Sequence, residues 1–443
     1  MKFVSTTGNT QSRVSLREAT MRPVCPDGGL YMPESIPQLP PAFFNNMNEM
    51  SLRDIGYVVA RSFLSESIEA SDIKDMVDHT LSFDMPLVKL DSQLYVMELF
   101  NGPSATFKDV ATRFISSAYK RDIALGRFNA RKPIALLATA GDSGAAMAIG
   151  MREVKGADII ILFPQGKINH IQREQLATAG NSVTAVEVRG SFDQCQRMVV
   201  EALSDPEINL GAEITSLNSL NILRLLPQMF HYFHAVASVM RKNPKAAAVS
   251  FALPGGNLGN LTAGIIAKRM GLPVQHFFVG VNANSPLPEY LASGVFRQHM
   301  PVSTIAGAID VVNPANFKRM ECLYHGDHKL MAEDISAAVC ESTEAIFGNM
   351  ADCHKRYGYL TDPHTATAYA AAKNMRHDDG VTVILATSHP AKSPEAVFNA
   401  TGVYPVTPPS IASLGDKRGR VIKISPRYPA LRNLILNDIL ANS

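Results

Sequence analysis

Seven short apolar runs, separated by segments of helical periodicity, limit the folds open to this chain. The runs cover residues 95–100, 133–139, 158–164, 183–188, 247–254, 275–281 and 381–387. Several are continuously apolar, which is typical of strands buried on both faces of a parallel sheet. Helical patterns lie between them, as over residues 145–154, 170–179 and 261–270. This order predicts an α/β fold with open, mostly parallel sheets and helices on both faces.

The length of the chain predicts more than one domain. A chain of 443 residues exceeds the size at which single hydrophobic cores stop growing, about 250–300 residues. We expect a mixed N-terminal region over residues 1–92, followed by two α/β domains over residues 93–240 and 241–443.

Charge and cysteine content exclude several classes of protein. The chain has 42 Lys and Arg against 40 Asp and Glu, a net charge of +2, which disfavours a nucleic-acid binder. No apolar run approaches the roughly 20 residues that span a bilayer, and the N-terminus lacks a secretory pattern. The five cysteines form no CxxC motif and predict reduced thiols without a metal site. We therefore expect a cytoplasmic protein.

In open α/β sheets, ligands bind beyond the carboxyl ends of the strands, so the loops there indicate function. The run 247–254 is followed by Gly-Gly-Asn-Leu-Gly-Asn over residues 255–260 and then by a helical pattern. Glycines allow close approach of the backbone, and a helix N-terminus offers free N–H groups to a phosphate. The spacing matches neither the dinucleotide nor the Walker motif. A tight turn without a ligand remains an alternative.

Lys108 follows the first run, in Phe107-Lys108-Asp109 at the start of a helical pattern. An amine that reacts with a carbonyl must be neutral, and an apolar or cationic setting favours that form. Pyridoxal phosphate requires such a lysine together with a phosphate cradle. By itself, a lysine is far more often a solvated surface residue, and it is the pairing of Lys108 with the glycine loop at 255–260 that favours the cofactor.

Other loops offer groups that bind anions. Gly141, Asp142 and Ser143 open a helix after the run 133–139, as either an anion nest or an ordinary N-cap. Arg224 lies in an apolar stretch, where a buried arginine requires an anion. Four further polar residues follow strand candidates or precede a helix: Lys167, Asn218, Ser219 and Thr387.

Taken together, these motifs resemble the threonine synthases of the bacterial and fungal branch, pyridoxal-phosphate enzymes of the tryptophan synthase β-like fold. The resemblance covers nearly the whole chain. It is carried by PDGGLYMPE (26–34), ELFNGPSATFKD (98–109), ATAGDSGAA (138–146), FPQGKI (163–168), NSLNILRLLPQ (218–228), GGNLGNLTAG (255–264) and LATSHPAKS (385–393).

The resemblance implies a role for each candidate. Lys108 is the Schiff-base lysine and the acid/base that moves protons between substrate carbons. The cofactor phosphate is held by Gly255, Gly256, Asn257, Leu258 and Gly259, and Thr387 faces the pyridine nitrogen. The loop with Gly141, Asp142 and Ser143 receives the substrate carboxylate. Lys167, Asn218, Ser219 and Arg224 bind the substrate phosphate.

The implied reaction converts O-phospho-L-homoserine and water into L-threonine and phosphate, in a monomer or homodimer whose domains close over the substrate. Two positions depart from the usual motifs: Ala140 replaces a serine before Gly-Asp, and Gly255-Gly256-Asn257 stands where the family often has Ser-Gly-Asn. Backbone N–H groups remain at both loops, so we interpret both changes as conservative.

Three alternative functions remain compatible with the sequence. One is a phospholyase, dehydratase or sulfhydrylase of the same fold, which would share Lys108 and the cradle. Such an enzyme would need the residues that bind the substrate phosphate only if its substrate is phosphorylated. The second is a non-catalytic phosphometabolite-binding scaffold. The third, a nucleotide-binding protein, lacks the Walker lysine and an acidic ribose partner.

Overall fold

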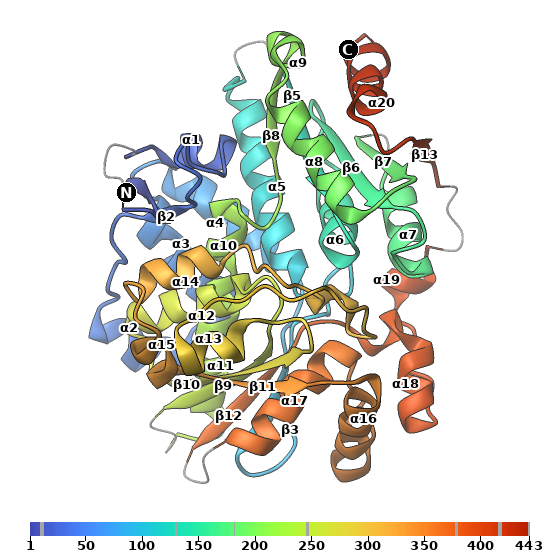
Figure 1. Cartoon of the computed structure of the whole chain (residues 1–443). Coiled ribbons are helices and arrows are strands. Elements are labelled where there is room, and N and C mark those ends of the chain that lie inside the picture. The colour runs from blue at the N-terminus through green and yellow to red at the C-terminus, as the bar shows by residue number, and fades with distance from the viewer. Residues whose placement is uncertain are drawn as a thin grey trace.

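Two separate, mostly parallel sheets form the two lobes of the molecule (Figure 1). The computed structural model describes residues 1–8, 13–128, 131–180, 182–244, 248–376, 380–414 and 419–441. All seven predicted strands are present, with ends within two residues of the expected ones; Ala247, in the run 247–254, lies outside the described residues. The α/β prediction is therefore confirmed.

The six-stranded sheet has the order β11-β10-β9-β12-β4-β3. Its strands are β3 (Leu87–Lys89), β4 (Leu94–Glu98), β9 (Val249–Pro254), β10 (Val274–Asn282), β11 (Ile335–Cys340) and β12 (Val381–Ala386). All neighbours are parallel except the edge pair β3 and β4.

The five-stranded sheet has the order β13-β7-β6-β5-β8 and is wholly parallel. Its strands are β5 (Lys132–Ala138), β6 (Asp158–Pro164), β7 (Val183–Val188), β8 (Ala212–Ser216) and β13 (Val421–Ile424). The edge strands β8 and β13 were absent from the predicted set, because their residues are mixed in polarity and only partly buried.

Helices cover both faces of each sheet, as predicted. In the six-stranded sheet, Phe251 packs against Tyr232 of a helix on one face, with ring centroids 4.8 Å apart, while Ala252 faces Ala368 on the other. In the five-stranded sheet, alternate residues of β5 likewise belong to different clusters. The chief helices are α5 (Lys108–Ala124), α6 (Asp142–Met151), α7 (His170–Ala177), α8 (Phe192–Leu203), α11 (Met229–Lys242), α12 (Gly259–Arg269), α16 (Thr343–Tyr357) and α17 (Pro363–Met375).

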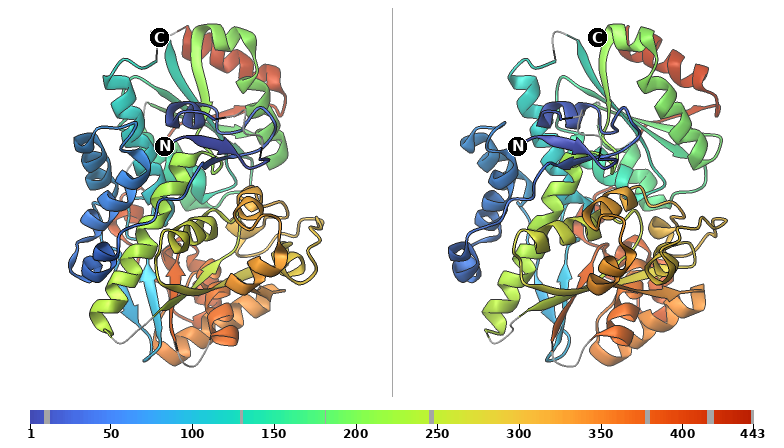
Figure 2. Two further views of the ribbon diagram at one scale, coloured as in Figure 1. Left: turned by 90° about the vertical axis from the view of Figure 1, so that its left-hand side faces the viewer. Right: turned by 60° about the vertical axis from the view of Figure 1, so that its left-hand side comes forward.

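The remaining elements are shorter. An antiparallel pair, β1 (Phe3–Ser5) and β2 (Tyr31–Pro33), belongs to the N-terminal region, whose helices flank both lobes (Figure 2). The other helices are α1 (Leu16–Met21), α2 (Pro41–Asn46), α3 (Leu52–Leu64), α4 (Ala70–Thr80), α9 (Pro206–Gly211), α10 (Ile222–Leu225), α13 (Leu287–Ser293), α14 (Phe317–Leu323), α15 (His328–Asp334), α18 (Pro394–Thr401), α19 (Pro409–Ala412) and α20 (Tyr428–Asn433). Single turns are η2 (Met47–Glu49), η3 (Leu226–Gln228), η4 (Gly307–Ile309) and η5 (Pro390–Lys392), and η6 (Leu434–Leu440) is a π-helix.

Strand pairing crosses the predicted domain limits at three places. In the six-stranded sheet β4 pairs with β3 and with β12, and in the five-stranded sheet β13 pairs with β7. The limits at 92/93 and 240/241 remain predictions. Within the described part of the chain, no helix has the length and apolarity needed to cross a membrane.

Candidate active site

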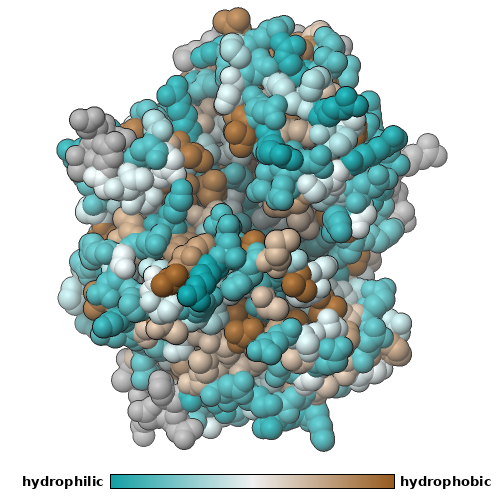
Figure 3. Space-filling view, in the orientation of Figure 1, coloured by the Kyte–Doolittle hydropathy of each residue, from teal (hydrophilic) through white to brown (hydrophobic). Residues whose placement is uncertain are grey.

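A cavity lies where the carboxyl ends of strands from both sheets meet, and the surface is hollowed between the two lobes (Figure 3). Ten of the residues expected from the sequence line this cavity: Lys108, Asp142, Ser143, Ser219, Arg224, Gly256, Asn257, Leu258, Gly259 and Thr387. Residues from five loops, far apart in the chain, thus converge as expected for an α/β fold.

The glycine loop after β9 is held tightly against the cavity wall. A Cβ atom on Gly256 would lie 2.9 Å from Ile309 Cγ2 and 3.3 Å from the Ala308 carbonyl oxygen, so only glycine fits. Leu258 adopts a left-handed conformation with φ of +58°, and α12 begins at the next residue. The first N–H groups of α12 have no acceptor within the helix, so this loop and helix end suit a phosphate.

Asn257 fixes the loop in place. Its Oδ1 accepts from the Ala315 backbone N–H at 2.8 Å, and its Nδ2 donates to Ser219 Oγ at 3.2 Å. The second contact joins the glycine loop to the segment that leads to Arg224. The two segments that are predicted to bind anions are therefore held next to each other.

Lys108, the first residue of α5, lies in the same cavity. Its Nζ lies 4.7 Å from the centre of the Phe107 ring. Burial lowers the pKa of Lys108, and the nearby cations Lys392 and Arg224 lower it further, against the opposing charge of Asp142. This setting favours the neutral amine, the form that reacts with a carbonyl.

Arg224 is buried in the cavity wall with only 4% of its surface exposed. Its Nη1 donates to the Leu217 carbonyl oxygen at 3.1 Å, and its Nε is buried without a hydrogen-bond partner. Burial lowers the pKa of Arg224 to about 10. No carboxylate among the described residues pairs with it, so an anionic ligand would satisfy a charge that the chain leaves open.

The loop before α6 is shaped by Thr139. The backbone N–H groups of Gly141 and Gly144 donate to Thr139 Oγ1 at 3.1 and 2.9 Å. Gly141 has φ of +153°, a conformation that favours glycine. Asp142 and Ser143 then start α6 at the cavity.

Four expected residues do not line the cavity. Lys167 lies exposed in the loop between β6 and α7, and Asn218 Oδ1 accepts from the Leu220 backbone N–H at 2.9 Å. Gly255 packs against β10, where a Cβ would lie 2.5 Å from Val279 Cγ1. Gly141 lies behind the cavity wall. The roles predicted for all four remain predictions.

Several lining residues were missed from the sequence, and His364 is the most informative. Its Nδ1 lies 2.5 Å from Asp362 Oδ2, and its Nε2 accepts from the Ala308 backbone N–H at 3.1 Å. Because Nε2 is the acceptor, Nδ1 is the ring atom that donates to Asp362. Since Ala308 borders Gly256, His364 supports the cavity wall. The Asp-Pro-His start of α17 was the only local signal.

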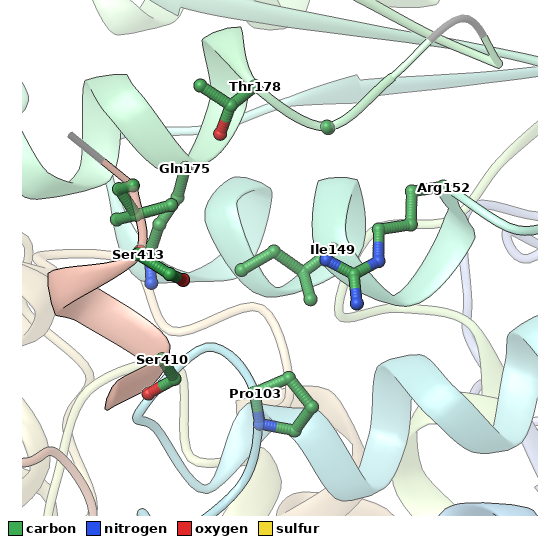
Figure 4. A pocket seen from close by; sticks show the side chains of 9 residues that line it. Pro103, Ile149, Arg152, Gln175, Thr178, Ser410 and Ser413 are labelled. Carbon is green, nitrogen blue, oxygen red and sulfur yellow. The ribbon is translucent and has the colours of Figure 1, made fainter. Parts of the chain in front are cut away.

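A second cavity, of about 170 Å³, shares no lining residue with the first (Figure 4). Its wall includes Arg152 of the α6 end, Gln175 of α7, and Ser410 and Ser413 at α19. Gln175 is buried, and it lines this second cavity only.

Comparison with known families matches three parts of the chain, of which the second and third overlap. Residues 2–81 match the model of the threonine synthase N terminus, residues 83–388 that of the pyridoxal-phosphate-dependent enzymes, and residues 365–435 that of the threonine synthase C-terminal region. Threonine synthase from Haemophilus influenzae is 34% identical over 397 residues, 89% of this chain and 90% of the relative.

The structure is also similar to solved structures of threonine synthases. The PLP-bound threonine synthase from Brucella melitensis superposes with a TM-score of 0.91 at 29% identity, covering 98% of both chains. The yeast enzyme superposes with a TM-score of 0.91 at 27% identity, covering 100% of this chain and 99% of the other. Because the model of pyridoxal-phosphate-dependent enzymes covers more than half of its length, and a threonine synthase is 34% identical over 89% of it, the chain belongs to the threonine synthase family of pyridoxal-phosphate-dependent enzymes.

Proposed function

We propose that the cavity between the lobes is the active site in which this enzyme converts O-phospho-L-homoserine and water into L-threonine and phosphate. The observation that carries the assignment is the pairing of two anion-binding places with one reactive lysine. The N-terminus of α12 suits one phosphate, and the unpaired guanidinium of Arg224 suits a second. The phosphate of the cofactor would occupy the first of these places and the phosphate of the substrate the second.

The residues present fit pyridoxal phosphate. Lys108 Nζ would be the amine for its aldehyde, the loop at Gly256–Gly259 would hold its phosphate, and Thr387, which follows β12 and lines the same cavity, would be the partner of its ring nitrogen. When bound, the cofactor supplies an electron sink for negative charge at the substrate Cα. A neutral hydroxyl at Thr387 leaves the ring nitrogen without a fixed counter-charge.

The other residues bind the substrate and move its protons. Lys108 Nζ, in its neutral form, takes a proton from the substrate Cα and returns protons later in the reaction. N–H groups at Asp142 and Ser143 receive the carboxylate. Arg224 and Ser219 stabilise the phosphate as it leaves. Lys167 and Asn218 join this group when the lobes close, a movement that also excludes water.

Product identity tests the proposal against its nearest rival. The purified enzyme with pyridoxal phosphate should release phosphate and form threonine in equal amounts from O-phospho-L-homoserine. Formation of 2-oxobutyrate in place of threonine would support a phospholyase of the same fold. A protein with no cofactor absorption, unchanged in Lys108→Ala, would support a scaffold.

We also propose a cytoplasmic enzyme that is a monomer or a homodimer. The five cysteines are free and four of them are buried, as suits a reducing compartment. Fractionation of cells and analytical ultracentrifugation of the holoenzyme test the two statements.

A further inference from the structure

Lys392 forms a buried ion pair with Asp142, and the proposed reaction leaves it without a role. Its Nζ lies 2.8 Å from Asp142 Oδ1, and the two side chains are only 2% and 3% exposed. The same ammonium donates to Gln175 Oε1 at 2.8 Å and to the Ser104 carbonyl oxygen at 3.2 Å. These three acceptors match its three N–H groups. Lys392 is therefore fully bonded.

Lys392 reaches the site only through its partner. Asp142 lines the cavity and Lys392 does not. The Gln175 amide that holds Lys392 belongs to the wall of the second cavity (Figure 4), where its Nε2 is fixed by the Ser104 carbonyl oxygen at 3.0 Å. Asn169 Nδ2 donates to the Lys392 carbonyl oxygen at 3.1 Å. The lysine is thus enclosed on the side away from the cavity.

The position of Asp142 raises an electrostatic problem. It is the first residue of α6, whose first-turn N–H groups are proposed to receive the substrate carboxylate. Without a counter-ion, the Asp142 carboxylate would repel the substrate carboxylate at this position. The repulsion is strong because water is excluded from the site. Gln172 Nε2 of α7 donates to Asp142 Oδ1 at 3.0 Å, so the side chain is held toward α7. Its charge still requires a counter-ion.

We propose that Lys392 is a positioning residue for the substrate carboxylate, because it neutralises Asp142 and keeps that side chain turned toward α7. The N-terminus of α6 then presents N–H donors without a net negative charge. This inference rests on the proposed function through the role given to the start of α6.

The groups around Asp142 determine what the loss of Lys392 would do. The charged and titratable neighbours are Lys108 of α5, Lys392 of η5 and His364 of α17, with Asp362 behind His364. Burial alone would raise the pKa of Asp142, and Lys392, followed by Lys108, more than offsets this and holds it below its usual range. Without Lys392, burial remains while the chief opposing charge is gone, so the pKa of Asp142 rises toward the assay range.

The test compares the KM for O-phospho-L-homoserine of the Lys392→Met and wild-type holoenzymes between pH 6 and 9. We expect the ratio of the two KM values to reach about tenfold at high pH, where Asp142 is ionised, and to fall as the pH is lowered. The kcat should change less than KM. Lys268→Met, which removes a 2.6 Å ion pair to Asp334 away from the cavity, is the matched control and should leave both constants unchanged.

A double variant separates charge from structure. Lys392→Met combined with Asp142→Asn removes the lone charge and should bring KM back near the wild-type value at every pH. If the role of Lys392 is purely structural, the KM ratio will not depend on pH and the double variant will not restore KM. Either of these two results would overturn the inference. Should Lys392→Met fail to fold, Lys392→Gln and the double variant give the same comparison. A wild-type enzyme that makes no threonine would instead refute the proposed function.

Discussion

The backbone N–H of Phe107 donates to the carbonyl oxygen of Thr387 at 2.9 Å. The residue before Lys108 is thus bonded to the residue that follows β12, although the two are far apart in the chain. A second bond, from the His389 N–H to the Ala105 carbonyl oxygen at 3.0 Å, continues this link. Lys108 and Thr387 are therefore held against the same cavity by main-chain bonds, independently of their side chains.

Replacement of Lys108 by alanine should abolish catalysis while the fold remains. We expect kcat to fall by roughly 10³-fold or more, because the amine proposed to bind the cofactor and to move protons is absent. The absorption band of the bound cofactor should disappear with it. Lys268→Ala is the control for a lost lysine outside the cavity. An active Lys108→Ala enzyme would contradict the assignment.

Gly256→Ala should weaken cofactor binding by about tenfold, since overpacking commonly costs 1–3 kcal/mol. The new Cβ would meet Ile309 Cγ2 at 2.9 Å. Cofactor titration followed by absorbance measures the effect. Gly348→Ala, in open space within α16, is the matched control. Adding Ile309→Ala should restore part of the affinity, and no recovery would mean that this contact is not the cause.

Arg224→Met should have opposite effects on activity and stability. We expect kcat/KM to fall by about 100-fold, as for loss of one transition-state donor. The ligand-free protein should melt at a higher temperature, because a buried, unpaired charge is removed. Inorganic phosphate should stabilise the wild type more than the variant in the same melting assay. Equal stabilisation of both proteins would show that phosphate does not bind at Arg224.

Asp109→Asn should change stability in a pH-dependent way. Burial raises the pKa of Asp109 to about 6, although its Oδ2 accepts from the Ser104 N–H at 2.8 Å. Between its unfolded pKa near 3.8 and its folded value, the folded state holds more protons, so stability falls as the pH rises.

The asparagine does not ionise and can keep the bond from Ser104. As the pH rises from 4 to 7, the free energy of unfolding of the variant should therefore increase relative to that of the wild type, by up to about 3 kcal/mol. Urea unfolding of the two ligand-free proteins at pH 4 and pH 8 checks this. A difference that does not depend on pH would rule out Asp109 titration as its source.

Local sequence determined the seven central strands and indicated the loops that are predicted to bind anions. Continuous apolar runs such as β6 are typical of buried strands, and the glycines before α12 marked a close approach of backbone. The edge strands β3, β8, β11 and β13 were not predicted, because their patterns are partly polar or rich in small residues, and pairing with a neighbouring strand is what makes them strands.

Only the tertiary structure decided which of these loops share a cavity. The sequence could not show that Lys167 is exposed, that Arg224 has no carboxylate partner among the described residues, or that Asp142 pairs with Lys392. The hydrogen bond between the Ala308 N–H and His364 could not be predicted from the sequence either. Apolar periodicity is a local property that the chain carries residue by residue. Burial, charge pairing and the shape of a cavity arise between segments that are distant in sequence, so they are defined only once the chain has folded.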